Sequence, residues 1–317
     1  MAERALADRV NEVVDVLLAR GNATAALADP ELAPLAVLAA ELRHCPSASY
    51  KDTLRAKLMR RTRMTTTLAP EKVREGFTTV TPYVRVPGEG LVSFLAQAFG
   101  AEETLAVTGT AGTHREVRVG NSMVMIGEGS AEDVMPIRPA AFHVFVPDVD
   151  AAYERALAAG GESMGVPEDR PYGERAGFVK DLFGNHWYIA TSLGSTAVPA
   201  GLHTVTPYLH PKSAATYIEF LKEAFGAVEV ARHADAAGVI RHAEVRLGDA
   251  VLQMGEGGVD PRPVSFYLYV SDVDALYRRA LDAGARSVQE PTVRPYGERV
   301  AAVEDADGTQ WWIAQPL

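Results

Sequence analysis

The hexapeptide Arg170–Arg175, "RPYGER", recurs unchanged at Arg294–Arg299. Other strings recur at nearly the same spacing: "VTPY" at Val80 and Val205, "AFGA" at Ala98 and Ala224, "GEG" at Gly127 and Gly255, and "DVDA" at Asp148 and Asp272. The offsets of 125, 126, 128 and 124 residues differ by no more than small loop insertions would cause. We therefore predict a domain of about 120 residues that is present twice, at 75–194 and 202–317.

Each copy has the same order of elements. An extended run ("TVTPYVRV" or "TVTPYLH") leads into an amphipathic helical segment that ends at a glycine, and three short strands follow. The pattern then restarts with a strand, a helix opened by the aspartate of "DVDA", and three more strands. This order predicts an α+β fold in which each copy consists of two βαβββ modules.

The segments outside the copies differ from them. Residues 1–70 contain helical runs with no counterpart elsewhere, such as "ALADRVNEVVDVLLARG" and "YKDTLRAKLMRRTRM". The second of these is basic on several faces, which fits either a solvated helix surface or a docking face for a protein partner. The segment between the copies, "GSTAVPAG", has the composition of a linker.

Composition limits the class of protein. With 47% hydrophobic residues in 317, the chain can bury large cores, and a net charge of -10 argues against nucleic acid as a partner. The single cysteine, Cys45, excludes an intramolecular disulfide and a cysteine-rich zinc site. The N-terminal residues carry acidic side chains within their apolar pattern, so we expect neither a signal peptide nor a membrane span, and a cytoplasmic location.

The repeated motifs resemble those of the vicinal oxygen chelate superfamily, which includes glyoxalases, bleomycin-resistance proteins and extradiol dioxygenases. The resemblance covers residues from about 76 to 317 and is strongest to the PhnB-like branch. It rests on "TPY" with "AFGA", on "HxEVR" before a glycine, on "DVDA", and on "YGER" followed by an aspartate and a tryptophan. The resemblance implies that paired modules form a half-open barrel whose concave sheet holds a ligand and, in the enzymes, usually a divalent metal.

The metal-ligand positions implied by this resemblance do not carry suitable side chains. They fall on Thr81, Met125, Ala141 and Tyr188 in the first copy and on Thr206, Gln253, Ser265 and Trp312 in the second. Methyl and aromatic groups do not supply the oxygen or imidazole donors that such a metal needs. We therefore predict no metal and no other cofactor. His143 lies two residues from Ala141 on the same strand face, either as a wall residue of the site or as a ligand displaced in register.

The polar candidates lie in the "HxEVR" motif of each copy. Strand alternation places its His, Glu and Arg on one face and its valines on the other, and we expect the polar face to be concave. One interpretation makes His114 with Glu116, and His242 with Glu244, acid–base pairs, with Arg118 and Arg246 tuning them. The other is a network of ion pairs on a solvated face.

Aromatic residues follow the same alternation. Those expected on the concave face are Tyr83, Phe145 and Tyr188 in the first copy, and Tyr208, Tyr267, Tyr269 and Trp312 in the second. Rings with few rotors suit a planar or apolar ligand, although they could equally serve as core. Because the second copy carries more rings, we expect two different pockets, or a single one in use.

The hexapeptide itself is interpreted as the turn of each copy's closing hairpin. Proline fixes φ and glycine permits the turn, and we expect Arg175 and Arg299 to pair with Asp181 and Asp305. Tyr172 and Tyr296 either border the site or belong only to the turn. No phosphate loop, dinucleotide fingerprint or nucleophile elbow occurs in the sequence.

These observations favour a metal-independent small-molecule binding protein that sequesters a toxic or antibiotic natural product. Its partner is then an aromatic or apolar small molecule, with no nucleic acid or membrane, and a protein partner remains possible through residues 1–70. The alternative is an enzyme, a lyase, isomerase or cyclase, that uses the His–Glu pairs as acid and base.

Overall fold

A computed structural model describes residues 73–74, 76–110, 112–129, 135–194, 196–256 and 264–317. The chain divides into two units, Met1–Thr66 and Thr67–Leu317, and all of the described residues belong to the second. The helices expected within residues 1–70, and the protein partner expected there, lie outside the described residues. None of the described helices is long and apolar enough to cross a membrane.

The predicted modules are confirmed in both copies. The first copy contains β1 (Val80–Val86), α5 (Leu91–Phe99), β2 (Glu102–Gly109), β3 (Gly112–Val119), β4 (Ser122–Glu128), β5 (Ala141–Phe145), α6 (Val149–Ala158), β6 (Glu162–Arg170), β7 (Glu174–Lys180) and β8 (His186–Ser192). The second contains β9 (Val205–Leu209), α7 (Ala214–Phe225), β10 (Val228–Ala234), β11 (Ile240–Leu247), β12 (Ala250–Met254), β13 (Ser265–Tyr269), α8 (Val273–Asp282), β14 (Arg286–Arg294), β15 (Glu298–Glu304) and β16 (Gln310–Pro316).

The helix ends follow the local signals in the sequence. The Asp148 and Asp272 side chains accept hydrogen bonds from the backbone N–H groups of Ala151 and Ala275, which caps α6 and α8. Gly100, at the end of α5, adopts a left-handed conformation with φ of 69°, which a residue with a Cβ adopts only at a cost.

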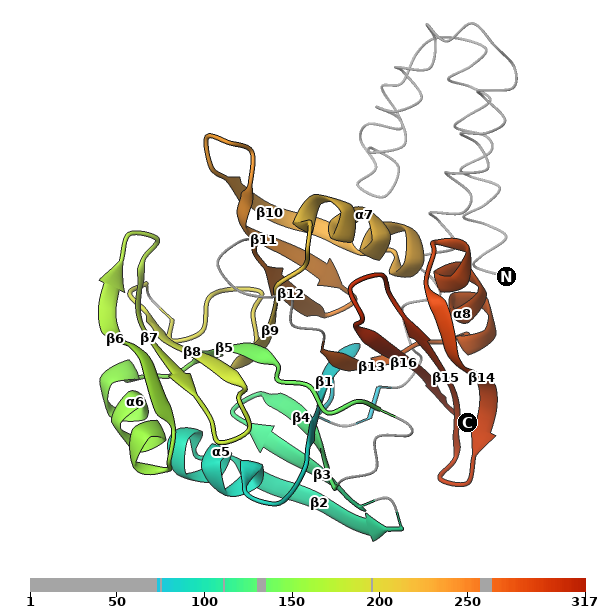
Figure 1. Ribbon diagram of the computed structural model, residues 1–317, viewed down its shortest axis with the longest axis horizontal. Coiled ribbons are helices and arrows are strands. Elements are labelled where there is room, and N and C mark those ends of the chain that lie inside the picture. The colour runs from blue at the N-terminus through green and yellow to red at the C-terminus, as the bar shows by residue number, and fades with distance from the viewer. Residues whose placement is uncertain (1–72, 75, 111, 130–134, 195, 257–263) are drawn as a thin grey trace, which may run out of the picture. The chain divides into compact units, whose positions relative to one another are not determined.

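The modules pair across the two copies. The first sheet has the order β14-β15-β16-β13-β1-β4-β3-β2, and the second has the order β10-β11-β12-β9-β5-β8-β7-β6. Each eight-stranded sheet thus combines one module of the first copy with one of the second (Figure 1). The prediction that the two modules of one copy share a half-open barrel was wrong on this point. All four modules carry the same alternation, so the sequence pattern does not specify which module edges join.

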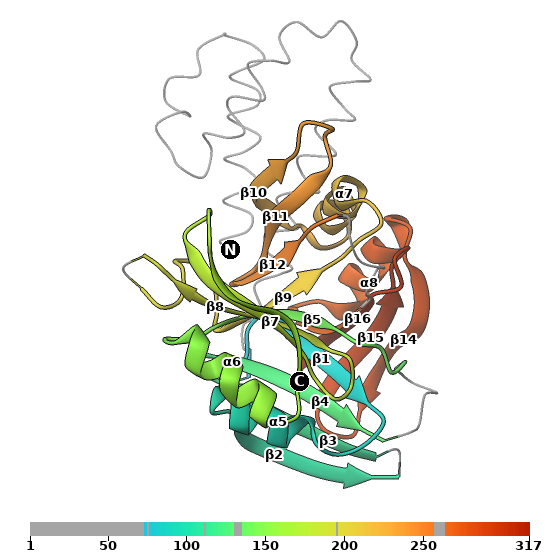
Figure 2. The ribbon, with the colours of Figure 1, turned by 60° about the vertical axis from the view of Figure 1, so that its left-hand side comes forward.

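Two antiparallel strand pairs make these joins. β1 pairs with β13, which places Thr81 opposite Tyr267, and β5 pairs with β9, which places His143 opposite Thr206. Figure 2 shows β5 of the first copy beside β9 of the second. Within each module the outer strands continue as antiparallel hairpins.

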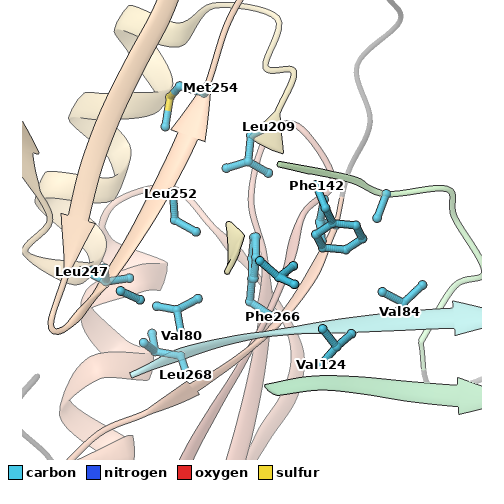
Figure 3. Close-up of a cluster of buried hydrophobic side chains, with 14 of the residues drawn as sticks. Val80, Val84, Val124, Phe142, Leu209, Leu247, Leu252, Met254, Phe266 and Leu268 are labelled. Atoms are coloured by element: carbon cyan, nitrogen blue, oxygen red, sulfur yellow. The ribbon is translucent and has the colours of Figure 1, made fainter. Parts of the chain in front are cut away.

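One face of each sheet packs on helices. Val80, Val124 and Phe266 from the first sheet and Phe142 and Leu252 from the second belong to one continuous apolar core (Figure 3). The helices α5 and α6 of the first copy contact each other, as do α7 and α8 of the second. None of the described helices packs on the opposite face of either sheet, which is called the helix-free face below and carries the alternate side chains.

A close approach between the copies explains one repeated glycine. A Cβ on Gly248 would lie 2.2 Å from Thr79 Oγ1, and one on Gly120 would lie 2.4 Å from Thr204 Oγ1. Both glycines have positive φ, 63° and 57° respectively. The loops that hold the two copies together thus contact each other in the same way twice.

Candidate functional site

The helix-free face of each sheet carries the candidate residues of both copies. The first site comprises the side chains on the helix-free face of the first sheet: Tyr83, His114, Glu116 and Met125 of the first copy, and Tyr267, Tyr269, Glu298 and Trp312 of the second. The second site comprises the equivalent positions of the second sheet: Tyr208, His242, Glu244 and Gln253 of the second copy, and His143, Phe145, Glu174 and Tyr188 of the first.

The structure therefore regroups the predicted residues. Alternation places each of them on the expected face, but Phe145 and Tyr188 do not share a site with Tyr83. They lie with Tyr208 on the second sheet, whereas Tyr267, Tyr269 and Trp312 lie with Tyr83 on the first. Because the modules pair across copies, each site needs both halves of the chain.

The strand register identifies the row of residues at the implied metal position. In the first sheet Thr81 lies opposite Tyr267, which lies opposite Trp312. In the second sheet Thr206 lies opposite His143, which lies opposite Tyr188. The metal-ligand positions that were expected at Ser265 and Ala141 thus lie two residues further along their strands, at Tyr267 and His143.

This row does not fit the divalent metal that the resemblance implies for the enzymes. In the first sheet it offers hydroxyl groups and an indole, with Met125 on the neighbouring strand. In the second sheet its one imidazole, His143, contacts Gln253 and Glu174 through its two ring nitrogens. Within the described ranges, no three His, Cys, Asp or Glu side chains are grouped so that they could hold a metal ion.

An arginine from the segment before β1 pairs with the carboxylate of the first site. Arg74 donates from its two terminal nitrogens to Oε1 and Oε2 of Glu116, at 2.5 and 2.7 Å. Its guanidinium also lies 4.6 Å from the ring centre of Phe77. Burial of Glu116 acts to raise its pKa, but hydrogen bonds from His114 and Arg74 outweigh burial and hold the pKa below its usual value.

The rest of the first site is largely aromatic, with Tyr267 and Trp312 buried and Tyr83 half-buried. Tyr267 donates a hydrogen bond to Glu298 at 2.5 Å, and burial together with this carboxylate raises the pKa of Tyr267. Burial raises the pKa of Tyr83 to about 12, and the Tyr83 hydroxyl contacts His114 Nδ1 at 3.0 Å. Trp312 is only 6% exposed, and its indole nitrogen has no hydrogen-bond partner within the described part of the chain.

A chain of polar side chains crosses the second site from one copy to the other. His242 Nε2 lies 3.4 Å from Glu244 Oε1, and Gln253 donates to the same oxygen at 3.0 Å. Since the Gln253 nitrogen donates to Glu244, the Gln253 oxygen faces His143 Nδ1 at 3.0 Å and accepts a hydrogen bond from its N–H. His143 Nε2 then lies 3.3 Å from Glu174 Oε2. Hydrogen bonding from His242 lowers the pKa of Glu244 although burial opposes this.

Aromatic rings form a wall beside this chain. Tyr188 packs edge-on against Tyr208 with ring centres 5.3 Å apart, and Tyr208 lies 5.1 Å from the His210 ring. Phe178 packs edge-on against the other side of Tyr188 at 5.3 Å. The Tyr188 hydroxyl also contacts His210 Nε2 at 2.9 Å. Rings from both copies thus surround a partly exposed face.

The second site is more accessible than the first at some matched positions, although His114 and His242 are equally exposed, at 32%. The Glu244 side chain is 20% exposed, against 4% for the equivalent Glu116. Tyr188 and Tyr208 are half-buried, whereas Trp312, the counterpart of Tyr188, is buried. The two sites thus differ in side-chain chemistry and, at these positions, in exposure, while the expectation that they take different ligands, or that one alone is used, stays a prediction.

The "RPYGER" turns lie next to the sites, but their arginines pair differently from the prediction. Arg175 donates to Asp150 at 2.7 and 2.8 Å, and Arg299 donates to Asp274 at 2.6 and 2.7 Å. The pairing with Asp181 and Asp305 was wrong because both aspartates are buried and accept hydrogen bonds from Trp187 and Trp311, respectively, and from backbone N–H groups.

The tyrosines of these turns border the sites. Tyr296 interacts with the Tyr267 hydroxyl of the first site, and Tyr172 raises the pKa of Tyr208 in the second, where burial is the larger cause. Both tyrosines are 66% exposed. Arg118 pairs with Glu102 at 2.6 Å with both side chains exposed, and Arg246 is exposed as well. For these two arginines the structure therefore matches the solvated-face interpretation.

Three contributors were missed in the sequence. Glu174 and Glu298 belong to the copied hexapeptide, so the repetition itself was a signal for them. Arg74 precedes the first copied string, and no pattern linked it to Glu116, 42 positions further along the chain.

Comparison with known proteins agrees with this geometry. The family model of the Glyoxalase/Bleomycin resistance protein/Dioxygenase superfamily matches residues 89–189 and 202–313, more than half of the chain. The chain belongs to this superfamily.

Named relatives and solved structures extend the comparison. Uncharacterized proteins of Mycobacterium bovis and Mycobacterium tuberculosis are each 36% identical over 126 residues, which is 36% of this chain and 83% and 74%, respectively, of theirs. Glyoxalase I from Zea mays is 15% identical with a TM-score of 0.60, covering 74% of this chain and 92% of that one. A putative dioxygenase from Bacillus subtilis is 13% identical with a TM-score of 0.52, covering 79% and 86%. At these identities the two structures show a shared fold.

Proposed function

We propose that this superfamily member is a metal-independent small-molecule binding protein that sequesters a toxic or antibiotic natural product in the cytoplasm. The aromatic wall of the second site carries the proposal. Tyr188 and Tyr208 are half-buried and present ring faces and edges from both copies on a face without helices. Rings of this kind contribute large apolar contact area with few rotors to immobilise.

The side chains at the implied metal position also support binding without a metal. Thr206, His143 and Tyr188 form this row in the second site, and His143 is already held between an amide and a carboxylate. Affinity then comes from apolar enclosure and stacking, and the polar chain orients the ligand. The proposal includes membership of the PhnB-like branch of the superfamily, which the resemblance of the repeated motifs supports.

Two measurements test the proposal. Elemental mass spectrometry of protein purified without chelators or an affinity metal is expected to find no stoichiometric divalent metal. Titration with the neutral aromatic dye N-phenyl-1-naphthylamine is expected to give saturable fluorescence that bleomycin or another aromatic natural product displaces. The displaced compound should be recovered chemically unchanged; a bound metal or a transformed compound overturns the proposal.

Variants assign the binding to the second site. Tyr188→Ala and Tyr208→Ala should each weaken dye binding about tenfold, because each ring contributes on the order of 1 kcal/mol or more. Tyr277→Phe is the matched control, since the Tyr277 hydroxyl contacts Ser287 on the helix side of the first sheet. Unchanged binding in both alanine variants would move the site elsewhere.

One observation favours an enzyme as the second candidate. The His242–Glu244 pair, with Glu244 held by a hydrogen bond from Gln253, supplies an acid and a base that can exchange a proton with the ligand. A lyase, isomerase or cyclase of this kind predicts that His242→Ala and Glu244→Gln variants lose turnover of a compound in a host metabolite extract. Equal conversion by wild type and both variants, followed by mass spectrometry, removes this candidate.

A further inference from the structure

Two equivalent segments precede the two copies and fold alike. The sequence "VREGFTTV" at 73–80 corresponds to "VPAGLHTV" at 198–205. In the first, Phe77 N–H donates to Arg74 O at 3.0 Å, and in the second Leu202 N–H donates to Pro199 O at 3.1 Å. Gly76 and Gly201 have φ of 83° and 86° at the same place in the turn. Arg74 and Pro199 are therefore structural counterparts.

Both segments also cover the same part of their sheets. Phe77 packs edge-on against Tyr269 of the first site, with ring centres 6.1 Å apart. Leu202 packs against the cluster of Phe145, the counterpart of Tyr269 in the second site. The apolar cover is thus conserved between the sites while one charged side chain is not.

The difference lies at the carboxylate. In the first site the Arg74 guanidinium occupies both oxygens of Glu116. In the second site the counterpart of Arg74 is a proline, which has no cationic group. Among the described residues, each hydrogen bond to Glu244 falls on its Oε1, from His242 and Gln253. No described residue takes the place of that guanidinium at Glu244 Oε2, and the Glu244 side chain is 20% exposed, against 4% for Glu116.

We propose that the second site takes an organic cation: an amidinium, guanidinium or primary ammonium group carried on an aromatic ring. Its cationic group occupies at Glu244 the place that the Arg74 guanidinium takes at Glu116. Its ring lies against Tyr188 and Tyr208, and its positive charge lies near aromatic rings as the Arg74 guanidinium lies over Phe77 in the first site. This inference rests on the proposed function and adds the chemical class of the ligand.

The electrostatic surroundings agree with a cationic ligand. Glu244 keeps its charge, because the His242 hydrogen bond lowers its pKa. A second carboxylate, Glu174, lies beyond His143 on the same face. Arg246 follows Glu244 at the next position of this face, but it is exposed. The chain as a whole carries a net charge of -10, which favours encounter with cations.

The probe for the test is 4-aminobenzamidine, an aromatic amidinium whose fluorescence rises in an apolar site, and its neutral analogue is 4-aminobenzamide. We expect one equivalent of the amidine to bind the full-length protein at least tenfold more tightly than the amide, since a hydrogen bond to a charged group has this size. Glu244→Gln should remove the preference. Glu219→Gln, on the exposed face of α7, is the matched control and should leave it unchanged.

A second variant introduces into the second site the guanidinium that the first site already has. Pro199→Arg supplies the missing guanidinium in a turn that already holds an arginine in its counterpart, so we expect it to fold and to weaken amidine binding at least tenfold. The thermal midpoint of each variant checks folding. If Pro199→Arg does not fold, the Glu244→Gln result decides alone.

The outcomes separate this inference from the proposed function. Equal affinity for amidine and amide, or an unchanged preference in Glu244→Gln, overturns the cation assignment while small-molecule binding stands. The absence of saturable binding of either probe also overturns the cation assignment. In that case the titration with the neutral dye tests the proposed function independently. Failure of both the dye and the probes overturns both.

Discussion

The ion pair between Arg74 and Glu116 can be tested by Arg74→Ala. The substitution removes two hydrogen bonds to a carboxylate whose side chain is 4% exposed. It also removes the guanidinium from the ring of Phe77. Glu116 keeps one contact, with His114 Nε2 at 3.4 Å. A buried carboxylate then remains with a weak partner.

The magnitude lies between two limits. Breaking a fully buried ion pair costs about 3–5 kcal/mol, whereas an exposed pair contributes about 0.2–1 kcal/mol. The Arg74 side chain is 39% exposed, so solvent screens the pair in part. We expect a loss of about 2 kcal/mol in the free energy of unfolding at pH 7, or about 4–8 °C in the thermal midpoint for a unit of this size.

The pH dependence gives the sign of the effect. Because the Glu116 pKa is lowered in the folded protein, its contribution to stability is present above the unfolded pKa and is lost as the pH falls through the folded pKa. The difference in the free energy of unfolding between wild type and Arg74→Ala should therefore be largest at pH 7. It should decrease at acidic pH, as Glu116 becomes protonated below the usual carboxyl pKa.

Urea unfolding of both proteins at a series of pH values measures this difference. Arg118→Ala is the matched control, because it breaks an ion pair with Glu102 whose side chains are 53% and 67% exposed. The control should cost no more than about 0.5 kcal/mol. The reasoning is refuted if Arg74→Ala costs no more than Arg118→Ala, or if its effect is the same at pH 3 and pH 7.

Three further predictions concern stability and metal content. Gly248→Ala should destabilise by more than about 2 kcal/mol in urea unfolding, because a Cβ there meets Thr79 Oγ1 at 2.2 Å in addition to the cost of positive φ. Gly297→Ala, also at positive φ but with no atom within 4 Å of the added Cβ, should cost only about 1 kcal/mol, and equal costs would contradict the role of the contact. Burial raises the pKa of Asp305 to about 6, so ionisation of this carboxyl group opposes folding. The contribution of Asp305 to the free energy of unfolding should therefore decrease as the pH rises from about 4 to about 6. Asp305→Asn should remove that trend relative to wild type while weakening the hydrogen bond from Trp311, and an identical pH profile would refute the assignment. Dialysis against a chelator should leave the thermal midpoint unchanged within about 1 °C, since the proposed function needs no bound metal; a drop of several degrees would contradict it.

The sequence by itself determined the modules. The recurrence of "RPYGER", "VTPY" and "DVDA" specified a duplication, and local signals such as the capping aspartates Asp148 and Asp272 specified where helices begin. Strand alternation also placed His114, Glu116 and their counterparts on the correct face. These features depend on neighbours a few residues away, so short-range physics is sufficient to predict them.

Only the tertiary structure decided which residues share a site. All four modules have the same pattern, and nothing local distinguishes pairing within a copy from the pairing across copies that the sheets show. The contact between His143 and Gln253 follows from this pairing and joins residues 110 positions apart. The contact between Arg74 and Glu116 lies within the first copy but still joins residues 42 positions apart. Arg74 and Pro199 occupy equivalent turns, so residue type decides that the first site carries a guanidinium where the second has a proline. Only the tertiary structure decides that this guanidinium meets Glu116, because the turn before β1 folds back over β3.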